Sequence, residues 1–362
     1  MTVVMTLLAR DEIDVVDSWL AFHLNAGVDL VIATDNLSRD GTTDVLEEYA
    51  RSGHVHLIRE DGDDLRQNEW VTRMARLAAT QYGADWVINS DADEFWWPRG
   101  ASLSEVLAAV PPRYGTVGAF LRVFCPRPGD GHFAERMTVR FSALAPINEP
   151  GSIYKPIRKI IHRGHPEIQV TRGNHALVDS PFKPLRGWFP IECFHFPLRS
   201  VAQSAHKAEL QGVAFEKYVK RPPTAYHADM YAALRSGWIA DYYEALVVSD
   251  DELERGVAQG RLVVDTRLRD ALRELRGPAG VGYLAPGSAE ALRFPLPTLV
   301  DDAEYAVEAA VLGEADVIRL QRRLDELEGR LQSVEQRLPR RAYRKLGRVA
   351  KRVVGGGRAD PL

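Results

Sequence analysis

The first ninety-odd residues alternate short apolar runs with amphipathic segments, and this alternation constrains the fold more than any other feature. Apolar runs at 3–8, 28–33, 54–58 and 86–89 are typical of buried strands. The intervening segments, at 12–26, from Thr42 onward and at 68–82, have apolar residues at helical spacing, and Gly27 suits the end of the first helix. This order predicts an α/β fold with a parallel sheet covered by helices on both faces.

The fourth predicted strand runs directly into two aspartates, Asp91 and Asp93. Residues two apart in extended chain point to one face, so we expect both carboxylates to project from the strand's carboxyl end, where open α/β sheets bind ligands. Two carboxylates without a nearby cysteine suit a hard divalent ion that also binds water and phosphate. The same alternation predicts that Glu94 points off this face. Asp61 and Asp63 share the spacing but lie in a polar run, which predicts a solvated turn.

Composition predicts a soluble globular protein, because 45% of the 362 residues are hydrophobic and 27% are charged. The sequence has no apolar run of membrane-spanning length and no cysteine besides Cys125 and Cys193, and we expect no signal peptide. We therefore expect a cytoplasmic location and no disulfide framework. The net charge is −4 although residues 340–358 hold eight Lys and Arg and no acid, so the rest is near −12. An acidic body makes nucleic acid an unexpected partner.

Beyond residue 97 the pattern divides the chain further. Residues 98–210 carry strand-like pieces at 116–124, 137–141, 159–163, 168–171 and 191–196, which suits an antiparallel extension for a second substrate. Residues 211–300 are expected to be mainly helical, with one helix over 225–248. Residues 301–339 have apolar side chains at heptad spacing over 317–338 and form either a helix packed on its own domain or a self-associating coiled coil. The basic tail, 340–362, is either solvated or bound to an anionic membrane through 340–358.

Several spaced motifs in the first half resemble those of the family 2 glycosyltransferases of the GT-A fold. The residues that carry the resemblance are Arg10, Asp11, Glu12, Trp19, His23, Gly27, Asp35, Asn36, Ser38, Asp40, Gly41 and the run from Asp91 to Phe95. The resemblance is firm over 1–97, looser to about 210 and absent beyond about 300. It implies a nucleotide-sugar-binding α/β fold with a C-terminal helical extension, and transfer of a sugar from a nucleotide diphosphate donor to an acceptor hydroxyl, usually with inversion and with Mn²⁺ or Mg²⁺.

The same resemblance implies roles for individual residues. The nucleotide pocket would be lined by Ala9, Arg10, Asp11 and Glu12. Asp35 would contact the base or ribose, and Asp91 and Asp93 would hold the metal and the ribose-diphosphate. Asn68, at the start of the third helix, faces the same rim and is a further donor contact. The alternatives are a plain helix start at 10–12 and a plain turn at 35–36.

His195 is the preferred third metal ligand, because it follows a strand and neutral imidazole suits Mn²⁺. A buried structural histidine is the alternative, and His175 is a second candidate. Trp96 and Trp97 would form either a platform for a sugar ring or part of the core. Basic residues at 155–159 would either assist the leaving diphosphate or form a solvated strand face.

The sequence does not identify the base that activates the acceptor hydroxyl, and the candidates are Glu149, Asp179 and Glu192. Three other functions compete with glycosyl transfer. A metal-dependent phosphoesterase would be expected to have more His and Asp ligands close together. A sugar nucleotidyltransferase would be expected to have a glycine-rich loop after the first strand, and residues 8–12 contain no glycine. A non-catalytic assembly protein would bind nucleotide and act through its coiled coil. A membrane-seeking tail favours an acceptor in cell-surface glycan or glycolipid synthesis.

Overall fold

The computed structural model describes residues 1–62, 66–142, 158–217, 225–277, 282–287, 292–298 and 301–310, together with positions 313 and 327. It contains two compact units, Met1–Tyr305 and Ala306–Leu362, and the candidate site lies in the first. Apart from position 327, the predicted heptad segment lies outside the described residues, as does the basic tail. In the described part of the chain, no helix combines the length and apolar character needed to cross a bilayer.

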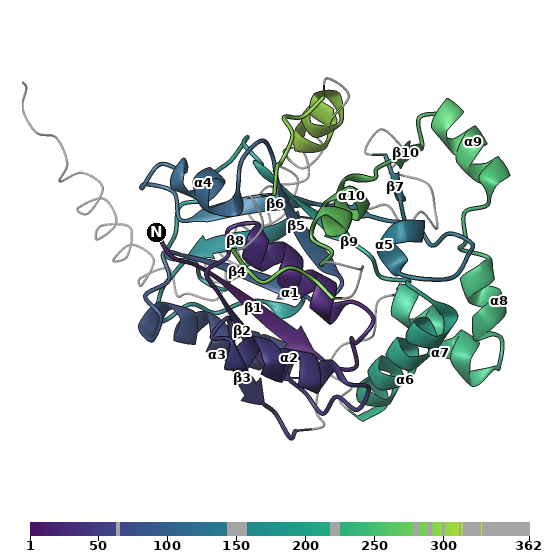
Figure 1. The fold of residues 1–362 in the computed structure, drawn as a ribbon, viewed down its shortest axis with the longest axis horizontal. Helices are drawn as coiled ribbons and strands as arrows, with labels where there is room; N and C mark the ends of the chain where they lie inside the picture. Colours follow the sequence, from purple (N-terminus) through teal and green to yellow (C-terminus); the bar gives the residue numbers. More distant parts are fainter. Residues whose placement is uncertain are drawn as a thin grey trace, which may run out of the picture. The chain divides into compact units, whose positions relative to one another are not determined.

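The predicted alternation of strands and helices is confirmed in the first ninety residues (Figure 1). The parallel strands are β1 (Val3–Ala9), β2 (Leu30–Asp35), β3 (Val55–Arg59) and β4 (Trp86–Asp91), in the order β3-β2-β1-β4. The helices between them are α1 (Val16–Asn25), α2 (Thr42–Arg51) and α3 (Gln67–Thr80). Met5 of β1 packs in one core cluster with Trp19 of α1, whereas its neighbour Val4 packs with Met74 of α3. Both faces of β1 are therefore buried, as its continuous apolar sequence requires.

Four more strands complete a mixed eight-stranded sheet of order β3-β2-β1-β4-β8-β6-β9-β5. They are β5 (Glu94–Pro98), β6 (Thr116–Val123), β8 (Arg158–Arg163) and β9 (Ile191–His195). Strand β8 is antiparallel to β4 and β6, β6 is parallel to β9, and β5 is antiparallel to β9. The predicted fold class, a mixed central sheet flanked by helices, is confirmed. A separate two-stranded sheet pairs β7 (Val139–Phe141) with β10 (Leu262–Val264).

The second half differs from prediction in three places. Residues 168–171 form no strand but an isolated bridge from Val170 to Leu177, followed by the short helix η1 (Arg172–Asn174). The helix expected over 225–248 is two helices, α7 (Ala225–Arg235) and α8 (Ile239–Glu244), because Gly237 between them has a φ of +79°. Strand β10 lies in a region expected to be helical. The other helices are α4 (Leu103–Ala108), α5 (Phe133–Arg136), α6 (Val201–Lys217), α9 (Asp250–Ala258) and α10 (Arg267–Glu274).

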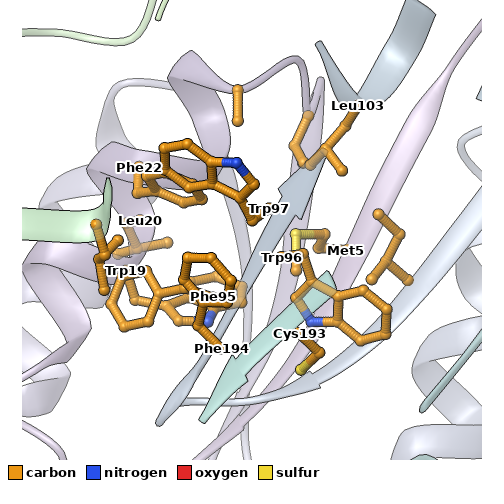
Figure 2. Close-up of a cluster of buried hydrophobic side chains, with 14 of the residues drawn as sticks. Met5, Trp19, Leu20, Phe22, Phe95, Trp96, Trp97, Leu103, Cys193 and Phe194 are labelled. Carbon is orange, nitrogen blue, oxygen red and sulfur yellow. The ribbon is translucent and has the colours of Figure 1, made fainter. Parts of the chain in front are cut away.

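Trp96 and Trp97 belong to the core rather than to a sugar platform, since both side chains are buried. Trp97 stacks on Phe194 of β9 with ring centroids 5.5 Å apart, and its ring centroid lies 5.9 Å from that of Phe22 of α1. Figure 2 shows these side chains within one buried cluster. This aromatic layer fixes β5 against β9 and α1. The turn that precedes β5 is thereby anchored to the core, and the candidate site is built around that turn.

Candidate active site

The candidate site lies where the strand order reverses. The chain passes from β1 outward to β2 and β3 and then returns to β4 on the other side of β1. The loops after β1 and β4 therefore diverge, and open α/β sheets bind ligands in the crevice at such a switch point. Ala9 pairs with Asp35, and Leu8 pairs with Asp91. This register brings the predicted donor residues after β1, Asp35 and Asp91 to one edge of the sheet.

Asp91 and Asp93 do not lie on one extended strand. Asp91 ends β4 and Glu94 begins β5, so Ala92 and Asp93 form a tight turn between two strands. Alternation consequently fails here, and the expectation that Glu94 points away is not met. Ligand atoms of Asp93, Glu94 and His195 all lie within 4.8 Å of one another. The structure thus brings Glu94, which the sequence did not suggest, into the predicted metal site.

The Asp91 carboxylate accepts hydrogen bonds from three side chains on other elements. Gln67 Nε2 at the start of α3 and Asn174 Nδ2 of η1 donate to Oδ1, at 3.2 and 3.3 Å. Lys159 Nζ of β8 donates to Oδ2 at 3.3 Å, and also lies 2.5 Å from Glu94 Oε1. Lys159 is buried, so it belongs to the site rather than to a solvated strand face.

Asp93 is 2% exposed and has a different set of partners. Lys207 Nζ of α6 donates to Oδ2 at 2.6 Å, while His195 Nε2 lies 3.5 Å from Oδ1 and Arg199 lies 3.9 Å from Oδ2. Burial alone would raise the pKa of Asp93, but Lys207 and His195 outweigh it and hold the pKa well below its usual range. Asp93 is therefore an ionised carboxylate at neutral pH.

The segment after β1 is interlocked with the segment after β2. Asp11 has a φ of +56°, and its N–H donates to Ser38 Oγ at 3.0 Å. Arg10 Nη1 donates to Asn36 Oδ1 at 3.3 Å. The buried Asp35 accepts a hydrogen bond from Thr43 Oγ1 at 2.5 Å. Helix α1 begins at Val16, so residues 10–12 form a separate loop before that helix.

Two residues near α6 tie this loop to the far side of the crevice. Arg199, which is buried, donates to Asp14 Oδ2 at 2.7 Å and also contacts Glu12. His206 Nε2 lies 2.7 Å from Asp11 Oδ2. In Figure 1, α6 lies beyond the arrowhead of β1, at the carboxyl edge of the parallel strands.

Three other predicted contacts, Asn68, Asp179 and His175, are not among the ligand atoms grouped around Asp93. Asn68 is exposed and lines a groove along α3 with Gln169, and its neighbour Gln67 contacts Asp91 instead. Asp179 is exposed in a loop with a φ of +42°. His175 Nδ1 lies 3.2 Å from the Arg158 carbonyl oxygen. Glu149 lies outside the described residues.

Glu192 is part of a buried ion network rather than of the crevice. It accepts from Arg122 at 2.7 Å and from Arg267 at 2.8 Å. The network continues through Asp265 and Arg140 to Glu304. Burial alone would raise the pKa of Glu192, but the two guanidinium groups hold it well below its usual range. A carboxylate held in this way is a poor proton acceptor, so we do not propose Glu192 as the base.

Trp19 and His23, two of the residues that carry the sequence resemblance, have structural roles beside the site. Trp19 Nε1 donates to the carbonyl oxygen of Glu94 at 2.7 Å, and the backbone N–H of Trp96 donates to His23 Nε2 at 3.0 Å. Burial lowers the pKa of His23 to about 3, so it stays neutral and can accept this bond. These two side chains of α1 fix the backbone directly after Asp93.

The donor set suits a divalent cation. Two ligands bound about 2.1 Å from one ion lie about 3 to 4 Å apart, which matches the 3.5 Å between Asp93 Oδ1 and His195 Nε2. Around the crevice, the carboxylates in these ion pairs are Glu12, Asp14, Asp91, Asp93 and Glu94, and the cations are Lys159, Arg199 and Lys207. Burial raises the pKa of Glu12 and the pKa of Glu94 to about 7, so a divalent cation bound beside them would favour their ionised forms.

Comparisons with known proteins give distant structural likenesses. No family model and no curated protein matches this sequence. A crystal structure of residues 1–349 of S. aureus TarS with UDP is 11% identical, with a TM-score of 0.32, over 81% of this chain and 100% of that chain. The same protein with UDP-GlcNAc has a TM-score of 0.32 at 11% identity, over 75% and 92%.

A third solved structure shares a shorter part of the fold. Glucosyl-3-phosphoglycerate synthase from Mycobacterium tuberculosis, in complex with Mn²⁺, UDP and glucosyl-3-phosphoglycerate, is 21% identical, with a TM-score of 0.24. The match covers 33% of this chain and 44% of that chain. Likenesses this distant assign no function, which has to be argued from the site itself.

Proposed function

We propose that this chain is a metal-dependent glycosyltransferase that moves a sugar from a nucleotide diphosphate donor to an acceptor hydroxyl. The observation that carries the proposal is the gathering of carboxylates from the carboxyl ends of β1, β2 and β4 at the switch point of the sheet. Open α/β sheets hold nucleotides at such a switch point. The sequence resemblance to family 2 glycosyltransferases supports the same reading.

The proposed roles follow the position of each group. The loop of Ala9, Arg10, Asp11 and Glu12 would line the nucleotide pocket, with Asp35 toward the base or ribose. Asp93 and His195 would hold Mn²⁺ or Mg²⁺, with Asp91 and Glu94 beside them. A divalent ion bound there would neutralise charge that develops on the leaving diphosphate. Arg199 and Lys159 would hold these carboxylates in place.

The acceptor hydroxyl would attack the anomeric carbon from the side opposite the diphosphate, which gives inversion. It needs a carboxylate base within hydrogen-bond reach, and that base remains unassigned. An acceptor in cell-surface glycan or glycolipid synthesis, a cytoplasmic location, membrane binding through 340–358 and self-association through 317–338 remain predictions.

Donor hydrolysis tests the proposal. UDP-, GDP- and dTDP-sugars are incubated with the protein, with Mn²⁺ or with EDTA, and the released nucleoside diphosphate is measured. We expect hydrolysis of at least one donor with Mn²⁺, at least a hundredfold loss in Asp93→Asn, and little effect of Asp130→Asn, an exposed carboxylate in a glycine-flanked loop. No release from any donor, or unchanged release by Asp93→Asn, contradicts the proposal.

A further inference from the structure

Lys207 is the cation closest to Asp93, and the proposed metal site does not account for it. Its ammonium lies 2.6 Å from Asp93 Oδ2, on the carboxylate that the proposed function assigns to the metal. In the sequence, Lys207 is one basic residue on a helix with no motif around it. The structure therefore raises the question of whether it is a permanent structural partner or a group that moves.

Two features, exposure and number of partners, distinguish Lys207 from the other cations of the site. Its side chain is 26% exposed, whereas those of Lys159 and Arg199 are 4% and 1% exposed. Lys159 is held by two carboxylates and by the Gly173 carbonyl oxygen, and Arg199 is held by Glu12, Asp14 and the Phe196 carbonyl oxygen. Among the residues that the structure describes, Lys207 donates a hydrogen bond to Asp93 and to no second group.

The two oxygens of Asp93 have different surroundings. Oδ2 accepts the hydrogen bond from Lys207 Nζ, and Oδ1 lies near His195 Nε2. A cation that enters between Oδ1 and His195 would place two positive charges close to the ammonium. The ammonium sits on a flexible four-carbon stem and can leave without disturbing the backbone. A diphosphate bound beside the metal would offer it new oxygen partners.

We propose that the Lys207 ammonium is a displaceable counter-ion of Asp93, which neutralises the carboxylate in the free protein and moves to the donor's diphosphate when a divalent cation binds. This inference rests on the proposed function, because it takes the diphosphate and the cation from that proposal. It makes Lys207 a direct contact of the leaving group. It also means that the free protein binds metal against competition from its own side chain.

Titration of Mn²⁺ into the protein alone, followed by the electron paramagnetic resonance signal of free Mn²⁺, tests the competition without turnover. Lys207→Met is expected to bind Mn²⁺ at least about tenfold more tightly than wild type, whereas Lys207→Arg keeps the charge and stays close to wild type. The control Lys183→Met removes an exposed lysine that lies over Tyr114 and should match wild type. Melting temperatures show whether each variant is folded.

Calorimetry with UDP, GDP and dTDP in turn, at a Mn²⁺ concentration that saturates both proteins, gives the second measurement. The nucleotide that binds wild type is expected to bind Lys207→Met at least about fivefold more weakly. Unchanged or weaker Mn²⁺ binding by Lys207→Met overturns the proposal, as does a lack of Mn²⁺ binding by both proteins. Tighter Mn²⁺ binding with no hydrolysis of any donor supports the counter-ion and refutes the glycosyltransferase. Donor hydrolysis by the wild type together with unchanged Mn²⁺ binding by Lys207→Met supports the glycosyltransferase and refutes the counter-ion.

Discussion

Replacing Glu192 with Gln should strongly destabilise the protein while leaving its chemistry intact. Glu192 neutralises Arg122, whose side chain is 2% exposed, and also pairs with Arg267. Gln keeps the shape but removes one negative charge from a buried network of guanidinium groups. Breaking a buried pair in this way costs about 3 to 5 kcal/mol. At roughly 2 to 4 °C per kcal/mol for a large domain, the melting temperature should fall by about 6 to 20 °C.

The pH dependence of the melting temperature tests the same prediction independently. The pKa of Glu192 is depressed in the folded state, so its stabilisation is complete above the unfolded value near 4.5 and is lost as the pH falls below it. The difference in melting temperature between wild type and Glu192→Gln should therefore be largest near neutral pH and shrink below about pH 4.5. Asp265 and Glu304 have depressed pKa values and act in the same direction.

Differential scanning calorimetry and donor hydrolysis together show whether Glu192 stabilises the fold or takes part in the reaction. The matched control is Glu47→Gln, which removes a carboxylate paired with Arg59 at the surface, where both side chains are about half exposed and the pair contributes about 1 kcal/mol or less. Below its melting transition, Glu192→Gln should retain wild-type activity. If the melting temperature of Glu192→Gln falls no more than that of Glu47→Gln, the ion network does not stabilise the fold as assigned. Loss of activity in the folded Glu192→Gln variant would restore Glu192 as a candidate base.

Three further substitutions test the surroundings of the site. Gly27→Ala should lower the free energy of unfolding by about 1 to 3 kcal/mol in urea titration, because its φ is +104° and the new Cβ would lie 3.0 Å from Ser104 Oγ. His23→Leu should cost about 1 to 3 kcal/mol in the same assay, because it leaves the buried Trp96 N–H without its acceptor. Gln67→Leu should weaken nucleotide binding in calorimetry at an unchanged melting temperature, because it removes a donor to the half-buried Asp91. If Gln67→Leu changes the melting temperature and leaves nucleotide binding unchanged, the proposed role of Gln67 in the site is wrong.

The parallel half of the fold was predictable because its signals are local. Each strand of the first ninety residues is a short apolar run, and each helix has apolar residues at helical spacing. Parallel strands bury both faces, so the order of elements already implies the layers. The residues at the carboxyl ends of these strands, Asp35 and Asp91 among them, were placed correctly at one edge because parallel strands share their direction.

The remainder depends on contacts between distant segments. The sequence gives no sign of the turn at Ala92 and Asp93, because Phe95, Trp96 and Trp97 continue the apolar pattern of a strand. Its direction is set by pairing of β5 with β9, about a hundred residues later in the chain. This reversal brought Glu94 into the site against the expectation from alternation.

The partners of the site carboxylates could not have been identified by pattern. Gln67 and Lys207 are polar residues on helices, where most polar residues face solvent. Asn174 offered a weak signal, because it directly follows a glycine, Gly173, and both residues have positive φ. Glu192 lies on a strand, and nothing local indicates that Arg122 and Arg267 surround it.

The most direct test of the central claim is calorimetric titration of UDP, GDP and dTDP into the full-length protein, with and without Mn²⁺. If the switch-point crevice is a donor site, at least one of these nucleotides binds, Mn²⁺ tightens that binding, and Asp93→Asn abolishes the effect of Mn²⁺ while Asp130→Asn does not. If none of the three binds under either condition, or if Asp93→Asn responds to Mn²⁺ as wild type does, the crevice is not a metal-dependent nucleotide-sugar site.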